Sequence, residues 1–268
     1  MRNDRPWVRY LVFRLCLSML SGCMGPAAAS AAPDVSGVDL ARIVANNKEA
    51  VQGSMGTADI QAIEVDLDIK EANATNAAVY RADRQGRMRI DIYAGGKRVY
   101  TEAYDGHRGW DWGGDGSAPT EDRYAAALWH GTQFPGLIFG LQDMAALGHK
   151  LEYIGREAVA GVDYYVLKLT LSDGFETYRY INPDTWLIER GRDFRAFHPA
   201  RGDKQTWIET VWSDYRPVEG VQRPFLSVNT DLVTGTWQAT NTVRAIKVNP
   251  PLDPAIFTKP SPRRMAAM

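Results

Sequence analysis

Cysteine is almost absent from this chain. Its 268 residues include only two cysteines, and both lie near the N-terminus, at Cys16 and Cys23. No thiol follows Cys23 in the sequence. The rest of the chain therefore has no internal disulfide, no thiolate metal site and no cysteine nucleophile.

An excess of charge of either sign is also missing. Lysine and arginine number 31 and aspartate and glutamate 32, which gives a formal net charge of −1 with histidine neutral. Proteins that bind nucleic acid usually carry a strongly basic surface. Nothing in this balance indicates nucleic-acid binding.

The motifs that mark common active sites are missing as well. The chain has no Gly-x-Ser-x-Gly nucleophile turn, no Walker phosphate loop and no His-Glu-x-x-His helix. Its four histidines, His107, His130, His149 and His198, show no metal-ligand spacing. We therefore predict a protein that is not an enzyme, with no catalytic residue, no metal and no cofactor.

The chain has one N-terminal apolar run, and it is too short to cross a bilayer. Residues 1–14 carry four arginines against one acid, residues 15–20 are mostly apolar, and small residues follow as far as Ala32. A basic segment, a short apolar segment and a small-residue exit are typical of a bacterial export signal. We predict that residues 1–32 are such a signal and are removed.

Two cleavage sites are possible at the end of this signal. Residues 29–31 read Ala-Ser-Ala and fit ordinary signal peptidase, with Pro26 ahead of them to end the helix. Residues 20–23 read Leu-Ser-Gly-Cys, which resembles a lipobox, in which Cys23 is acylated and becomes the mature N-terminus. In both cases the chain is exported, and in the second it is anchored through Cys23.

Period-two patterns dominate the rest of the chain. Residues 147–190 predict an antiparallel meander, because one face of the central strand is formed by Tyr165, Leu167, Leu169 and Leu171. Asp173-Gly174 is a strong hairpin signal, since both types accept the positive φ that a tight turn needs. A two-residue loop would place Lys168 opposite Arg179, a like-charge pair that favours a solvated face.

The same reasoning predicts about eleven strands. They are residues 63–70, 78–83, 87–93, 97–105, 149–155, 164–171, 175–181, 186–190, 206–216, 223–231 and 236–249. A helical stripe follows Asp39 and ends at Gly53. So many strands exceed what a flat open sheet holds without curling. We predict a mainly β (α+β) fold in one domain, residues 33–258, with a flexible tail at 259–268.

The middle of the chain has a different character. Residues 134–141, Phe-Pro-Gly-Leu-Ile-Phe-Gly-Leu, are the most hydrophobic stretch after the leader. A helix is expected before them and another at residues 142–147. Such an apolar insertion between two runs of strands indicates a plug or lid on the concave face of a curved sheet. The candidate ligand-lining residues are Trp110, Trp112, Phe134, Leu137, Ile138 and Phe139, which are equally well explained as ordinary core.

Five segments taken in order carry a resemblance to a known family. They read AYDGHRGWDW, LGHKLEYIGREAVAGVDYYVLKLTLSDG, YRYINPDTWLIER, SDYRPVEGV and VNPPLDPAIF, within residues 38–258. In this order they resemble the outer-membrane lipoprotein-sorting proteins, relatives of the LolA/LolB lipoprotein carriers. The resemblance implies a curved antiparallel half-barrel wrapped around a few short helices, with an apolar concavity for acyl chains. It carries over no individual ligand-contacting residue, and this chain is longer than the carriers proper.

Three classes of function remain. The resemblance favours a non-catalytic carrier in the periplasm of a Gram-negative bacterium, with an acyl chain of a lipid or lipoprotein as its ligand and peripheral association with the membrane. The second is an envelope-stress sensor or interaction domain on the same fold, acting through an envelope protein partner. The third is a hydrolase with no site visible in the sequence.

Overall fold

The computed structural model describes residues 38–52, 56–113, 117–119, 122–196 and 204–260. The predicted export signal and its Cys23 lie outside these residues, as does the end of the predicted tail from residue 261 onward. The elements below all belong to the unit Ala31–Met268.

The described part of the chain forms one antiparallel sheet of thirteen strands. The strands are β1 (Ala62–Glu71), β2 (Ala74–Asp83), β3 (Met88–Ala94), β4 (Lys97–Tyr104), β5 (Gly109–Trp112), β6 (Ser117–Pro119), β7 (Lys150–Val159), β8 (Val162–Thr170), β9 (Glu176–Ile181), β10 (Ile188–Arg195), β11 (Thr206–Val218), β12 (Val221–Asp231) and β13 (Thr236–Val248). The predicted mainly β fold is confirmed. Two strands, β5 and β6, lie outside the eleven predicted ranges and extend one edge of the sheet.

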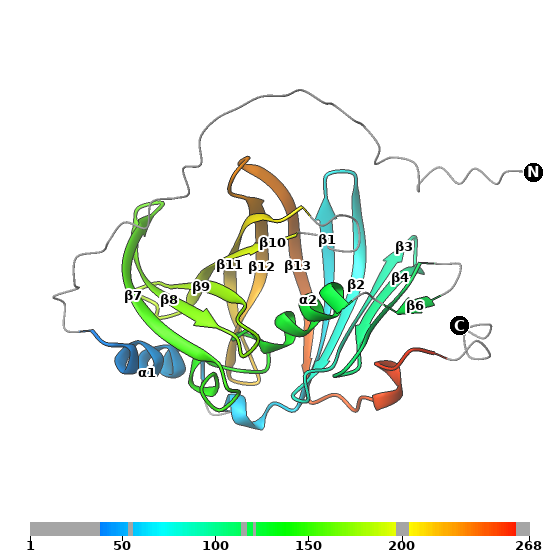
Figure 1. Ribbon diagram of the computed structural model, residues 1–268, viewed down its shortest axis with the longest axis horizontal. Coiled ribbons are helices and arrows are strands. Elements are labelled where there is room, and N and C mark those ends of the chain that lie inside the picture. The colour runs from blue at the N-terminus through cyan, green and yellow to red at the C-terminus, as the bar shows by residue number, and fades with distance from the viewer. Residues whose placement is uncertain (1–37, 53–55, 114–116, 120–121, 197–203, 261–268) are drawn as a thin grey trace, which may run out of the picture. The chain divides into compact units, whose positions relative to one another are not determined.

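Hairpins determine almost the whole strand order, β6-β5-β4-β3-β2-β1-β13-β12-β11-β10-β9-β8-β7. Each strand pairs with its neighbour in sequence within two runs, and the pairing of β1 with β13 joins the runs. The strands β6 and β7 form the two edges, so the sheet does not close. It curves as a half-barrel around the helix that connects these edges (Figure 1).

Two α-helices lie in the described residues. The first, α1 (Leu40–Val51), begins where predicted, because the Asp39 side chain accepts a hydrogen bond of 2.8 Å from the backbone N–H of Arg42. The second, α2 (Asp122–Gln133), connects the edges β6 and β7. The expected helix at residues 142–147 is instead a 3₁₀ turn, η2 (Leu141–Asp143). Two further 3₁₀ turns are η1 (Thr57–Asp59) and η3 (Pro254–Ile256).

The main core lies on the concave face of the sheet. Most of its buried residues come from six strands and from the chain around α2: Ile63, Val65, Ala82, Met88, Tyr104, Leu169 and Val221 from strands, with Leu128, Ile138, Phe139 and Met144. The helix α1 packs on a second cluster formed by Tyr165, Leu167 and Ile181. None of the helices among the described residues has the length and apolarity that a membrane span requires.

The register of the β8–β9 hairpin differs from the prediction by one residue. Leu171 N–H donates to Phe175 O at 2.8 Å, so the loop has three residues and ends at Gly174 with φ of 92°. A three-residue loop with a left-handed last residue is a common hairpin type. Because a one-residue slip moves side chains to the opposite face, Arg179 pairs with Leu167 instead of Lys168 and faces the concave side.

Candidate functional site

Four of the six predicted ligand-lining residues belong to a single loop between α2 and η2, residues 134–140. Ile138 and Phe139 are buried in the concave core, and Phe134 and Leu137 are half-buried against it. The loop turns tightly, since Gly136 N–H donates to Phe139 O at 2.9 Å. This 134–140 loop therefore covers part of the concave face with apolar side chains.

The other two predicted residues lie on the opposite face. Trp110 is the Cα partner of Ala103, whose neighbour Tyr104 belongs to the concave core, so Trp110 points outward. Its indole Nε1 donates to Phe257 O at 2.7 Å, which fixes the C-terminal segment on the outer face. Trp112 shares the face of Trp110, two residues along the strand. The structure therefore does not bring the two tryptophans together with the 134–140 loop.

A charged cluster on the outer face explains the position of these tryptophans. The Asp91 carboxylate accepts hydrogen bonds from Arg89 at 2.8 and 2.9 Å and from Thr101 at 2.7 Å. Burial raises the pKa of Asp91, but the hydrogen bonds from Arg89 and Thr101 outweigh it and hold the pKa below its usual range. The Arg89 guanidinium also lies over the Trp110 ring, 5.7 Å from its centroid. This is a structural cluster rather than a ligand site.

Two arginines are buried on the concave side, and sequence reasoning missed both. Arg179 is 1 % exposed and donates from Nη1 to Thr177 Oγ1 at 2.6 Å. The same nitrogen lies 3.5 Å from the Asp193 carboxylate. The guanidinium is also held against the Phe134 ring, 4.6 Å from its centroid. Gly191 leaves the room for it, because a Cβ there would lie 2.5 Å from Arg179 Nη1.

Arg223 of β12 is equally buried, at 1 % exposure. Its Nη1 donates to two carbonyl oxygens of the 134–140 loop, those of Gly136 and Leu137. Burial lowers the pKa of Arg223 to about 10. The sequence could have indicated that Arg223 is buried, because it alternates with Val221 and Phe225, two buried apolar residues on the same face of the strand.

The end of α2 is tied to the β8–β9 turn by polar contacts. His149 is buried, its Nδ1 accepts from Ser172 N–H at 3.1 Å, and its Nε2 lies 3.3 Å from Gln133 Oε1. On α2, one helical turn before Gln133, His130 Nε2 lies 2.7 Å from the Asp173 carboxylate. These contacts hold the helix just before the 134–140 loop.

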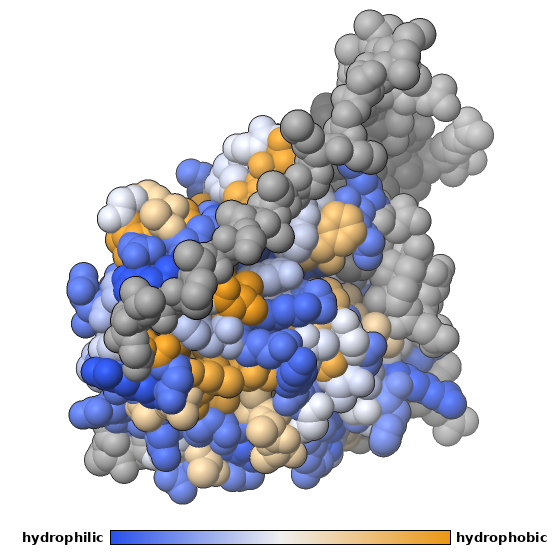
Figure 2. All heavy atoms as spheres, turned by 60° about the vertical axis from the view of Figure 1, so that its left-hand side comes forward, coloured by the Kyte–Doolittle hydropathy of each residue, from blue (hydrophilic) through white to orange (hydrophobic). Residues whose placement is uncertain are grey.

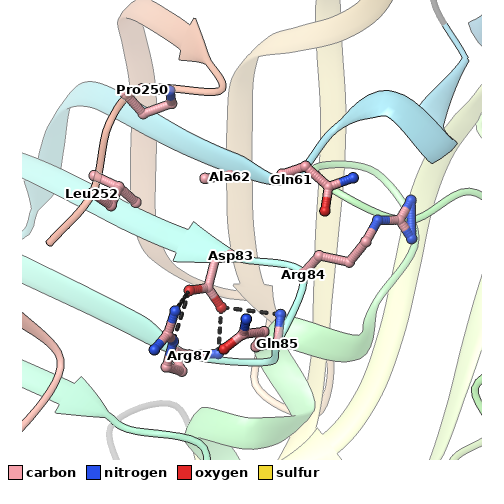
Figure 3. Close-up of a pocket in the computed structure, with 8 residues that line it drawn as sticks. All are labelled: Gln61, Ala62, Asp83, Arg84, Gln85, Arg87, Pro250 and Leu252. Carbon is pink, nitrogen blue, oxygen red and sulfur yellow. Dashed lines mark hydrogen bonds and ion pairs between the residues drawn. The ribbon is translucent and has the colours of Figure 1, made fainter. Parts of the chain in front are cut away.

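A separate pocket of about 220 Å³ lies where the β2–β3 turn meets the chain after β13 (Figure 3). It is lined by Gln61, Ala62, Asp83, Arg84, Gln85, Arg87, Pro250 and Leu252. Asp83 is bound by Arg87 at 2.6 Å, and Arg84 donates to Thr57 O at 2.6 Å. Its charged groups thus have partners within the protein. No cluster of three metal-ligating side chains occurs among the residues described.

The side of the molecule that includes β7 and α1 shows hydrophobic residues between hydrophilic ones (Figure 2). Ile154 of the edge strand β7 is 45 % exposed. The apolar stripe of α1 is covered, because Leu40, Ile43 and Val44 pack in the cluster around Tyr165. This surface is mixed in character, so the concave face remains the better candidate site.

Comparison with known proteins identifies the architecture. No protein-family model matches the chain, and no curated protein matches its sequence. A LolA superfamily protein from Nitrosomonas europaea superposes with a TM-score of 0.51 at 14 % identity, over 83 % of this chain and 98 % of that one. An outer membrane lipoprotein-sorting protein domain from Vibrio parahaemolyticus gives 0.54 at 12 % identity, over 81 % and 95 %. The chain has the LolA-like fold.

A third structural match is a DUF1329 family protein from Desulfovibrio piger, with a TM-score of 0.53 at 12 % identity over 81 % of this chain and 94 % of that one. The resemblance predicted from the sequence is thus confirmed in the fold. At these identities the likeness concerns the LolA-like fold alone, so the chemistry of the site comes from this chain's own residues.

Proposed function

We propose that this protein binds an acyl chain of a lipid or lipoprotein on the concave face of its half-barrel, without a catalytic step. The observation that carries the proposal is the 134–140 loop, which packs apolar side chains on the concave face and is hydrogen-bonded to the sheet through Arg223. Ile138 and Phe139 occupy the concave core although they belong to no strand or helix. Apolar sites of this kind suit a ligand without polar groups along its length.

The 134–140 loop has the features of a movable cover. Pro135 and Gly140 lie on either side of the segment that holds Leu137, Ile138 and Phe139. Gly136 has a φ of 135°, which favours glycine. Nothing lies within 4 Å of the position that a Gly136 Cβ would occupy, so the loop faces open space there. Displacing the loop would uncover apolar surface that an acyl chain can replace.

The energies suit a carrier that also releases its ligand. Each buried methylene contributes roughly 0.8 kcal/mol, so burial of most of one acyl chain gives about 8–10 kcal/mol before other terms. Association and the ordering of ligand and loop cost about 4 kcal/mol or more, which leaves a Kd of roughly tens of micromolar or weaker. The proposal includes export to the periplasm of a Gram-negative bacterium, where such a carrier would pass lipids or lipoproteins toward the outer membrane.

The test is binding of a fluorescent fatty acid to the wild type and to Leu137→Asp. Leu137 is half-buried in the 134–140 loop, so its replacement adds a charge where the ligand would lie while the buried Ile138 and Phe139 stay in place. We expect Kd to rise by about tenfold or more, since a charge facing an acyl chain is poorly tolerated. Ile154→Asp on the edge strand is the matched control and should bind like the wild type.

Far-UV circular dichroism and the thermal midpoint of each variant report whether the fold survives. Lipid that copurifies with the wild type, identified by mass spectrometry, gives a second and independent readout. If the wild type binds no acyl probe and carries no lipid, the carrier proposal fails and a protein-interaction role takes its place.

A further inference from the structure

Among the described residues, two arginines are buried on the concave side, Arg179 and Arg223, and an acidic side chain accompanies only Arg179. Arg179 has the Asp193 carboxylate 3.5 Å from its Nη1. Arg223 forms no ion pair with any acidic residue in the described part of the chain, although it too is 1 % exposed. Burial of a charge is costly unless an opposite charge accompanies it. Arg223 therefore carries a buried charge without the carboxylate that accompanies Arg179.

The hydrogen bonds of Arg223 occupy one corner of its guanidinium. Nη1 donates to the carbonyl oxygens of Gly136 and Leu137, whereas Nε and Nη2 are buried without a hydrogen-bond partner. Nε and Nη2 form one edge of the planar group, and their N–H bonds point the same way. That edge matches the two oxygens of a carboxylate or phosphate.

The position of this edge links it to the proposed acyl site. Val221, two residues before Arg223 on the same face of β12, packs in the concave core together with Ile138 and Phe139. The carbonyls that Nη1 contacts belong to the 134–140 loop itself. A ligand with its chain beneath that loop would thus have its polar end within reach of Arg223.

We propose that Arg223 binds the anionic head of the ligand, so that the protein selects an anionic amphiphile, carboxylate or phosphate, over a neutral lipid. This rests on the proposed function and deepens it. The free Nε–Nη2 edge accepts the two anionic oxygens side by side, while the acyl chain lies against the apolar residues of the concave face. The incoming anion neutralises a charge that no acidic side chain in the described part of the chain accompanies.

The experiment compares two fluorescent probes that differ only in charge, cis-parinaric acid and its methyl ester, at pH 8 with the full exported chain. We expect the wild type to bind the acid about tenfold or more tightly than the ester, the size expected for a charge-assisted, two-point contact. Arg223→Gln should remove this preference by weakening only the acid. Arg223→Lys keeps the positive charge but lacks the two parallel N–H donors of the guanidinium, so it should retain part of the preference that Arg223→Gln loses.

A matched control comes from the neighbouring strand. Arg216 is the Cα partner of Arg223 in β11, but its side chain is 56 % exposed and paired with Asp214 at 2.6 Å. Arg216→Gln should leave the acid preference unchanged. Ester binding by every variant shows that the fold and the acyl site survive, so a variant that merely unfolds is recognised by the loss of both probes.

Competition separates the sources of the anion. Phosphatidylglycerol that displaces the acid much better than diacylglycerol assigns a phosphate head, displacement by oleate alone assigns a carboxylate, and displacement by excess inorganic phosphate assigns a free anion. Equal binding of acid and ester by the wild type overturns the role of Arg223 while the acyl site stands. Binding of neither probe overturns both proposals. An unchanged acid preference in Arg223→Gln also contradicts this inference.

Discussion

Single residues decide where the chain can turn, and Gly174 is the clearest case. It is the last residue of the three-residue loop between β8 and β9, with φ of 92°. No atom lies within 4 Å of the position that a Cβ would take there. Any cost of replacing Gly174 therefore comes from the backbone conformation and not from a steric clash with neighbours.

We predict that Gly174→Val lowers the free energy of unfolding by about 1 kcal/mol or more, because a β-branched residue is strained at positive φ. Gly174→Asn is the control, since asparagine enters the left-handed region more readily and should cost less. Urea denaturation of the three proteins measures the difference. Equal midpoints for valine and glycine would contradict the turn geometry.

The residue scale is also where sequence reasoning reached its limit. Alternation placed Tyr165, Leu167 and Leu169 on one face correctly, because the period of a strand depends on its own residues. It placed Arg179 on the wrong face, because the register depends on whether Asp173-Gly174 or Ser172-Asp173-Gly174 forms the loop. Both readings satisfy local turn preferences, and only long-range packing of Arg179 distinguishes them.

At the scale of elements, the important connection is the one between α2 and the β8–β9 turn. His149 joins them as a neutral imidazole: its Nδ1 accepts the Ser172 N–H, and its Nε2 lies within hydrogen-bond distance of the Gln133 amide oxygen. Burial lowers the pKa of His149, and the nearby Asp173 carboxylate offsets this only in part. The native state thus disfavours the protonated ring.

This connection predicts a stability that falls with acidification. A histidine whose pKa is lowered by folding takes up its proton more readily in the unfolded chain, so unfolding is promoted once the pH drops below the ordinary value of about 6.5. Above that pH the contribution is fully present. We expect the urea midpoint to decrease between pH 7.5 and pH 5.5, and His149→Gln to reduce that decrease.

The control for this measurement is His107→Gln, in the exposed turn between β4 and β5. This variant should preserve the decrease of the urea midpoint. If His149→Gln and the wild type lose stability equally, the buried ring is not the source.

Elements with strong periodicity were predictable and those without it were not. The helix α1 followed from Asp39 and the apolar stripe behind it, and β1 from its strict alternation. The short strands β5 and β6 and the 3₁₀ turn η2 have too few residues to show a period. Their conformations depend on neighbours that the local sequence does not reveal.

At the scale of the whole molecule, the sheet consists of two runs of hairpins joined by β1 and β13. Local turns specify each run, whereas the single pairing between the ends of the strand sequence is long-range. The concave site lies over both runs, since its core takes Ile63 and Met88 from one and Leu169 and Val221 from the other. The position of the 134–140 loop over this face therefore depends on both runs of strands being joined in one sheet.

The last prediction concerns how the assembled molecule is delivered. We expect expression with the native leader in a Gram-negative host to yield a periplasmic form that lacks about the first thirty residues. Its α1 begins at Leu40, capped by Asp39, so cleavage after residue 31 or 32 leaves the first described helix intact. Intact-mass measurement of the purified protein identifies the cleavage site that is used.

Cleavage at the lipobox, before Cys23, has a different physical consequence. A mass that begins at Cys23 with added acyl chains would place the protein on a membrane, and the segment from Cys23 to Asp39 would reach at most about 55 Å. Two or more acyl chains anchor a protein far more stably than one, so such a form would fractionate with membranes. A full-length mass that retains the arginine-rich start would instead contradict export, and with it the supply of envelope lipid to the concave face.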